Sequence, residues 1–305
     1  MNQTTKPETV KVLLAFAAIY IVWGSTYYGV SIALKSFPPF LLAALRLLFA
    51  GSVLLIVWIV RRESLPSIKD LVKHAACGVT MFIGGMVAVV WAQQYVSSSL
   101  ASVIITTPFW FVLLDRKQWK FYFSSKWILT GLITGLIGVV LLLGTRERVS
   151  HHGDMQTISI VVMIVGSGMW ALGSLFLKYH ATDTSTFVSS SIQLLAAGFV
   201  CLGVSALSNE FTTFKWNELG LDSVIALSYL SIVSSLITFM AFVWLIKIRP
   251  PAVVSTYAYV NPIVGVLIGW GLGNEHVTSI QLAALAITLC GVFFVNIPKY
   301  QPRTT

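Results

Sequence analysis

The chain has 305 residues, of which 56% are hydrophobic and only 10% are charged, and its mean hydropathy is +0.84. A soluble domain carries about 25% charged residues, so this composition excludes a soluble protein and predicts a chain that crosses a membrane several times. The net charge of +9 would favour nucleic-acid binding in a soluble protein. Here it fits basic loops that are kept on one side of a membrane. The three cysteines lie inside apolar runs, which argues against a disulfide framework.

Ten apolar segments approach or exceed the length of about 20 residues that a membrane-spanning helix needs. The first is longer than the core of a secretory signal peptide, so we expect it to remain as a span. The connections are short and leave no room for a soluble domain. The predicted fold is therefore all-α, a polytopic membrane protein with ten transmembrane helices. Their predicted ranges are 12–34, 39–60, 73–95, 98–114, 127–145, 156–178, 186–207, 222–246, 251–272 and 278–297.

Lysine and arginine are distributed unevenly between the loops. If the N-terminus lies inside, fifteen of them fall on the inner side and only four on the outer side. Short loops rich in these residues stay in the cytoplasm. Both termini are therefore predicted to be cytoplasmic, which requires an even number of spans.

An internal repeat emerges when residues 23–55 are aligned without a gap on residues 170–202. The matches include Trp23 with Trp170, Phe40 with Phe187, Leu47 with Leu194 and Gly51 with Gly198, and further on Pro108 with Pro262. Chance similarity between apolar segments is the alternative, and the paired tryptophans and prolines argue against it. Because each half holds five spans, the second half is predicted to be inverted relative to the first, with the two repeats at 12–145 and 156–297. Such inverted repeats are typical of secondary transporters that bind solute between the halves.

Three motifs carry a resemblance to a known family. They are Ile21-Val22-Trp23-Gly24-Ser25-Thr26, Ala44-Leu45-Arg46-Leu47-Leu48-Phe49-Ala50-Gly51 and Tyr257-Ala258-Tyr259-Val260-Asn261-Pro262 with the following Gly273-Asn274-Glu275. The chain resembles the drug/metabolite transporter superfamily, in its EamA-type branch, over residues 12–297. The resemblance implies a carrier of small metabolites, amino acids or related organic solutes first, that works in the export direction. One departure is that Phe121 stands where a second, symmetric glutamate would match Glu275.

Arg46 is the only charged residue predicted to lie deep in a span. It follows Pro39 by seven residues, which places it about 10 Å into the helix. A charge at such a depth costs about 2.5–3.5 kcal/mol on insertion scales and marks a pathway or a fixed partner. In a functional role, its guanidinium meets a carboxylate on the solute or shapes the electric field of the cavity. In a structural role, it extends to the outer membrane interface or bonds to backbone carbonyls of a neighbouring helix. Gln193 occupies the matching place in the second half, so an anion site would be one-sided.

Aromatic, hydroxyl and amide side chains within the spans are the candidates for a cavity lining, which would suit a moderately apolar solute with a few hydrogen-bonding groups. Serine and threonine also serve as ordinary packing residues of membrane helices. A proline inside a helix leaves a carbonyl without its usual partner, and we predict hinges at Pro108 and Pro262. The predicted substrate-binding residues are Trp23, Thr26, Tyr27, Arg46, Trp91, Gln93, Thr106, Trp110, Trp170, Gln193, Tyr257, Tyr259 and Asn261.

No acidic residue and no histidine lies in the interior of a predicted span. All of them, including Asp115, fall at or beyond the span ends. We therefore predict no proton relay, no metal, no cofactor and no catalytic residue, and the chain is not expected to be an enzyme. The predicted protein is an alternating-access carrier in the cytoplasmic (inner) membrane. Its partners would be a small solute and the lipid bilayer, without nucleic acid, and it would act as a monomer or dimer. The alternatives are a carrier of amphiphilic drugs, an importer, or a non-transporting membrane sensor or assembly protein.

Overall fold

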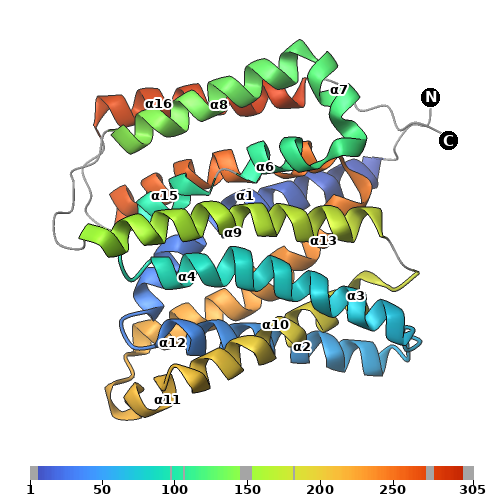
Figure 1. Ribbon diagram of the computed structural model, residues 1–305, viewed down its shortest axis with the longest axis vertical. Helices are drawn as coiled ribbons and strands as arrows, with labels where there is room; N and C mark the ends of the chain where they lie inside the picture. The colour runs from blue at the N-terminus through green and yellow to red at the C-terminus, as the bar shows by residue number, and fades with distance from the viewer. Residues whose placement is uncertain are drawn as a thin grey trace.

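The computed structural model describes residues 6–96, 98–105, 107–144, 153–180, 183–272 and 278–297. In these ranges every regular element is a helix, and none is a strand, which confirms the predicted all-α class. The long helices lie roughly parallel or antiparallel to one another across the molecule, and the two termini lie on the same side (Figure 1).

The described residues of the first half form ten helical elements, several of which follow one another without a break. They are α1 (Lys6–Ala33), α2 (Pro39–Val60), α3 (Ile68–Val79), the π-helix η1 (Thr80–Val87), α4 (Ala88–Ala92), α5 (Ser98–Ile104), α6 (Thr107–Leu114), the 3-10 helix η2 (Arg116–Gln118), α7 (Trp119–Ser124) and α8 (Lys126–Gly144).

The second half has a corresponding succession of helical elements. They are α9 (Gly153–Tyr179), α10 (Thr186–Leu207), α11 (Glu210–Thr213), the 3-10 helix η3 (Trp216–Glu218), α12 (Leu221–Tyr229), the π-helix η4 (Leu230–Thr238), α13 (Phe239–Ile248), α14 (Pro251–Val254), α15 (Tyr257–Leu272) and α16 (Ser279–Asn296).

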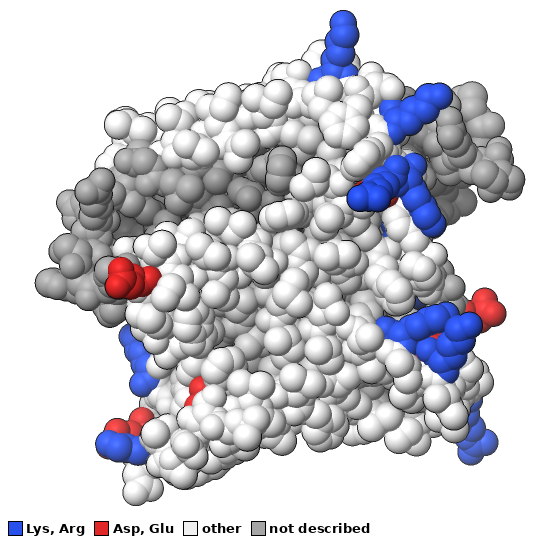
Figure 2. Space-filling view, viewed as in Figure 1, with Lys and Arg blue, Asp and Glu red and all other residues white. Residues whose placement is uncertain are grey.

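Seven helices in the described part of the chain are long and apolar enough to cross a membrane. The other three predicted spans correspond to shorter elements, namely α5 with α6, α8 and α16. Large apolar side chains on the outside remain exposed, for example Leu13, Ile56 and Ile133 at 60% or more, as expected of surfaces that face lipid. Figure 2 shows a broad uncharged band, with lysine and arginine concentrated towards the end where the termini lie.

Predicted spans four and nine are both interrupted. Span four consists of α5, which ends at Ile104, and α6, in which Pro108 is the second residue. In span nine, α14 ends at Val254 and α15 begins at Tyr257. The second interruption therefore precedes Pro262, which lies inside the continuous helix α15. The proline is tolerated there because the helix is buried against protein on several sides.

Helices α2 and α10 form a closely packed antiparallel pair at one end of the molecule, and α8 and α16 form another at the opposite end (Figure 1). A Cβ atom added at Gly51 would lie 2.8 Å from Leu195 Cγ, and one added at Gly198 would lie 2.8 Å from Leu48 Cγ. Both glycines and both leucines are separated by 147 residues in the chain. The two contacts are thus the same contact made twice, as an inverted repeat requires.

Two glutamates extend this reciprocity to the helix ends. Glu210 accepts hydrogen bonds from the backbone N–H groups of Phe40 (3.2 Å) and Leu41 (2.7 Å), at the start of α2. Glu63, again 147 residues earlier, accepts from the hydroxyl of Ser185, the N-cap residue of α10. A carboxylate stabilises the positive end of a helix dipole, so each half contributes an anchor for the first turn of its partner helix.

The reciprocal glycine contact generates a prediction about stability. Gly198→Ala forces a methyl group against Leu48 and should destabilise the protein by about 1–3 kcal/mol. Gly203 lies on the same helix with nothing within 4 Å of an added Cβ, so Gly203→Ala should be neutral or stabilising by up to about 1 kcal/mol. Melting temperatures in detergent measure both effects. Equal shifts for the two variants would contradict the close contact.

Candidate functional site

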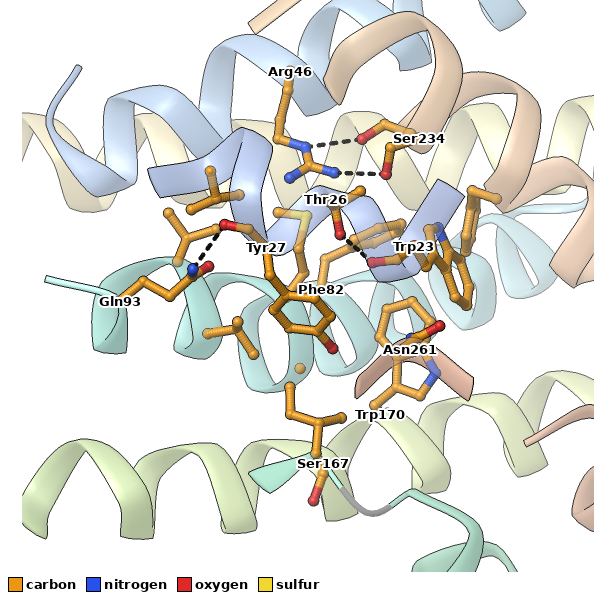
Figure 3. A pocket seen from close by; sticks show the side chains of 18 of the residues that line it. Trp23, Thr26, Tyr27, Arg46, Phe82, Gln93, Ser167, Trp170, Ser234 and Asn261 are labelled. Atoms are coloured by element: carbon orange, nitrogen blue, oxygen red, sulfur yellow. Dashed lines mark hydrogen bonds between the residues drawn. The ribbon is translucent and has the colours of Figure 1, made fainter. Parts of the chain in front are cut away.

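A cavity of about 100 Å³ lies in the interior, between elements of both halves. This volume accommodates several water molecules or a small organic group. Figure 3 shows its labelled side chains converging from helices of the two halves. The lining residues are Trp23, Thr26, Tyr27, Val30, Arg46, Phe82, Gly85, Met86, Val89, Val90, Gln93, Ile105, Ser167, Trp170, Ser234, Ser235, Phe239, Tyr257 and Asn261.

The two repeat-related tryptophans touch each other at the cavity. The rings of Trp23 and Trp170 meet edge to face with their centroids 5.5 Å apart. Since these residues hold equivalent positions in the two halves, their contact marks the approximate two-fold axis of the inverted repeat. Tyr257 adds a second edge-to-face contact to Trp23 at 4.9 Å. The cavity is therefore bounded by an aromatic cluster at the place where the halves meet.

Arg46 enters the cavity from α2 and is only 4% exposed. Its Nε donates to the Ser235 hydroxyl at 3.0 Å, and its Nη2 donates to the Ser234 hydroxyl at 3.2 Å. Among the described residues, no acidic side chain lies within ion-pair distance of the guanidinium. The charge of Arg46 is therefore buried within the protein, and the protein partners that accept from it are neutral.

Two further polar atoms of the lining lack a protein partner among the described residues, namely Gln93 Oε1 and Trp170 Nε1. The amide nitrogen of Gln93 is already used, because it donates to the carbonyl of Tyr27 at 2.9 Å. A buried polar atom without a partner is costly. Two residues of the lining thus each carry a buried polar atom without a protein partner in the described part of the chain, one an acceptor and one a donor.

Asn261 connects the cavity to the backbone of two helices. With its amide nitrogen oriented to donate, it reaches the carbonyls of Tyr257 (2.9 Å) and Tyr20 (3.2 Å). Its side chain also hydrogen-bonds to Tyr27. The residue before Pro262 is therefore held by α1, and the polar group on this face of α15 is satisfied.

Eight of the predicted substrate-binding residues are brought together at the cavity. They are Trp23, Thr26, Tyr27, Arg46, Gln93, Trp170, Tyr257 and Asn261. Four others, Trp91, Trp110, Gln193 and Tyr259, are not among its lining residues. Thr106 lies outside the described residues, as does the Gly273-Asn274-Glu275 motif.

The four that do not reach the cavity have other packing partners. Trp91 packs on Tyr95 with a centroid separation of 5.4 Å, and Trp110 faces Gly168. Gln193 is fully buried with its backbone against Gly78, and the ring of Tyr259 lies against Gly135. Trp110, Gln193 and Tyr259 thus lie on sides of their helices that face a neighbouring helix, whereas Trp91 packs on a residue of its own segment. Helical spacing alone does not distinguish these two buried sides.

Ser234 and Ser235 were not predicted, and neither were the apolar lining residues Phe82 and Phe239. The two serines lie in η4, a π-helix that the sequence pattern does not reveal. Only their position in a polar interruption of an apolar span could have drawn attention to them. Phe82 and Phe239 are indistinguishable in sequence from residues of the packed core.

A buried polar cluster lies on the side of the molecule where the termini are. Asp115, 1% exposed, accepts hydrogen bonds from Tyr122 (2.7 Å) and Tyr179 (2.5 Å), which belong to different halves. Lys178 Nζ donates to the carbonyls of Ile246 (2.9 Å) and Arg249 (2.7 Å) at the end of α13. Burial raises the pKa of Asp115, and the hydrogen bonds from Tyr179 and Tyr122 partly oppose this. The hydrogen bond between Tyr179 and Asp115 ties the two halves together on this side.

Comparison with known proteins identifies relatives over the whole chain. The model of the EamA-like transporter family matches residues 10–144 and again residues 157–297. The inner membrane transporter YedA of Escherichia coli, described as uncharacterized, is 32% identical over 94% of this chain and 90% of its own length. The uncharacterized transporter YoaV of Bacillus subtilis is 22% identical over 93% of this chain and 96% of its own.

A plant protein and a solved structure are also similar to this chain over most of its length. The WAT1-related protein At3g02690 of Arabidopsis thaliana, described as chloroplastic, is 24% identical over 92% of this chain and 68% of its own length. One crystal structure superimposes with a TM-score of 0.74 at 20% identity, covering 95% of this chain and 97% of the other. This structural match supports the fold.

The Asp115 cluster predicts a pH-dependent effect on stability. Asp115→Asn keeps a hydrogen-bonding group towards Tyr122 and Tyr179 but removes the buried charge, so it should raise the melting temperature at neutral pH. Because the folded-state pKa of Asp115 is raised, acidification protonates the wild-type carboxyl and relieves the same penalty. The advantage of the variant should therefore shrink as the pH falls. If Asp115→Asn instead destabilises as strongly as Asp115→Ala at neutral pH, the ionised carboxylate itself holds this contact.

Proposed function

Because the chain belongs to the EamA-like transporter family, we propose that it is a secondary carrier that exports small metabolites across the cytoplasmic membrane by alternating access. Amino acids and related organic solutes are its first candidates. The observation that carries this proposal is the cavity at the contact between Trp23 and Trp170, with the guanidinium of Arg46 buried in its wall.

The polar groups of the cavity support an amino acid. Arg46 and Trp170 Nε1 provide hydrogen-bond donors that suit a carboxylate, whereas Gln93 Oε1 provides an acceptor that suits an ammonium group. The aromatic rings of Trp23 and Tyr257 add surfaces that attract a cation or an apolar side chain. A zwitterion with a small side chain would use all of these groups at once.

The size of the cavity favours a small solute over an amphiphilic drug. Drug-sized ligands occupy pockets of about 300–1,000 Å³, whereas this cavity measures about 100 Å³. Its single buried guanidinium also opposes cationic amphiphiles, because like charges repel strongly where water is scarce.

Contacts between the two halves support a transport cycle with two states. Ala33 and Leu42, on the side away from the termini, are fully buried, and at the end where the termini lie the hydrogen bond from Tyr179 to Asp115 joins the halves. The excess of basic residues at this end supports its assignment to the cytoplasm. The reciprocal contacts of the two proposed repeats, 12–145 and 156–297, would let a second state mirror this one.

A substitution at Arg46 tests the proposed function directly. In liposomes containing the purified protein, we expect flux of some amino acids from a radiolabelled panel and slower flux of the corresponding amides. Arg46→Gln should reduce flux of the acids by about tenfold or more, since it removes a charge-assisted bond, and should affect the amides little. Equal losses for acids and amides would assign Arg46 to structure. No flux of any solute through well-folded protein would favour the sensor or assembly alternative.

Pro262 provides a test of movement in span nine. Pro262→Ala restores a backbone N–H in α15 and should stiffen the helix, so we expect turnover to fall by severalfold while membrane insertion and solute affinity stay near the wild-type values. Flux normalised to inserted protein is the measurement. Unchanged turnover would move the hinge to the interruption between α14 and α15.

A further inference from the structure

The π-helix η4 (Leu230–Thr238) brings two consecutive serines to the same guanidinium. In a π-helix the backbone hydrogen bonds run from residue i to residue i+5, so neighbouring residues diverge less around the axis than in an α-helix. Ser234 and Ser235 are each 2% exposed and both accept from Arg46. Such π-helical turns are often found at functional sites, and this one presents two hydroxyl groups to a single guanidinium.

The two serines occupy one edge of the guanidinium. The Nε–H group and one Nη2–H group point in the same direction, and these are the donors that Ser235 and Ser234 accept. The end of the guanidinium, formed by Nη1 and the second hydrogen of Nη2, is not engaged by either serine. In Figure 3 the third nitrogen points away from the serines, towards the side of the cavity where Tyr27 and Gln93 lie.

Because Ser234 and Ser235 are neutral, they leave the positive charge of Arg46 uncompensated. A carboxylate at the position of either serine would form an ion pair and neutralise the site, whereas a hydroxyl accepts a hydrogen bond and carries no charge. Hydrogen bonding by neutral groups also fixes the plane of the guanidinium, which determines the orientation of its free end. A planar, fixed fork is the arrangement that binds carboxylates in a bidentate manner.

We propose that Ser234 and Ser235 are positioning residues that hold Arg46 by one edge and present its free end to the cavity as a bidentate site for a monoanionic carboxylate. This inference rests on the proposed function and adds the determinant of its selectivity. The single positive charge of the site matches one carboxylate group. Because Ser234 and Ser235 occupy the other edge of the guanidinium, no second anion can bind there. Solutes without an anionic group would gain nothing from this arrangement.

Binding of propionate and propionamide tests the proposal, because the two probes have the same shape and differ in charge. In detergent-purified full-length protein, we expect the wild type to bind propionate more tightly than propionamide. The double variant Ser234→Ala with Ser235→Ala should weaken propionate binding by about tenfold without changing propionamide binding. Replacing each serine by threonine, which keeps the hydroxyl, should restore most of the preference.

Two further variants keep the outcome clear. Ser231→Ala removes a buried serine of the same helix that donates to Leu227 and does not line the cavity, so it should leave the preference unchanged. Ser235→Asp introduces a carboxylate beside Arg46 and should abolish propionate binding while propionamide still binds. This second variant remains informative if the double alanine variant does not fold.

The possible failures are distinguishable. If Arg46→Gln removes the preference for propionate but the serine variants, Ser235→Asp included, retain it, the positioning role is wrong and the proposed function stands. If wild-type protein does not prefer propionate, or if Arg46→Gln retains the preference, the carboxylate site itself is wrong. A loss of both probes in the serine variants, with Ser231→Ala intact, would assign the serines to structure and overturn the inference.

Discussion

Within a bilayer, every polar group that leaves the water must find its partner inside the protein, and this constraint organises the whole molecule. The charge of Arg46 is accommodated by two hydroxyl groups, and both belong to a π-helical segment. Glu210 satisfies the first N–H groups of α2. Lys178 satisfies the last carbonyls of α13. What is left without a protein partner at the centre is therefore informative about the solute.

The inverted repeat explains where these unsatisfied groups gather. Reciprocal contacts such as Gly51 with Leu195 and Gly198 with Leu48 tie the two halves into a symmetric frame, and Trp23 meets Trp170 on its axis. The frame is symmetric but the cavity is not, because Arg46 lines the cavity and the corresponding Gln193, which is fully buried, does not. A solute with one anionic end would thus have a single preferred orientation between two nearly equivalent halves.

Much of this architecture can be predicted from the sequence, because membrane helices have strong and simple patterns. The helical class, the repeat and the buried charge follow from apolar length, from paired tryptophans and from one arginine in a long apolar run. The sequence does not reveal which side of a buried helix faces the cavity, so Tyr257 and Tyr259 look equally suitable although only Tyr257 lines it. It also hides the π-helix that carries Ser234 and Ser235, since local hydrogen-bond register depends on tertiary packing. Tertiary packing also decides where span nine is interrupted, and the interruption lies before Tyr257 and not at Pro262.

The central claim is that the free end of Arg46 receives the carboxylate of a solute at the junction of the two halves. A structure determined by electron cryo-microscopy in lipid nanodiscs, with the transported amino acid at saturating concentration, tests it most directly. The account predicts solute density in the cavity with its carboxylate within hydrogen-bonding distance of Nη1 and Nη2 of Arg46. A solute bound elsewhere, or with its carboxylate turned away from Arg46, would contradict it.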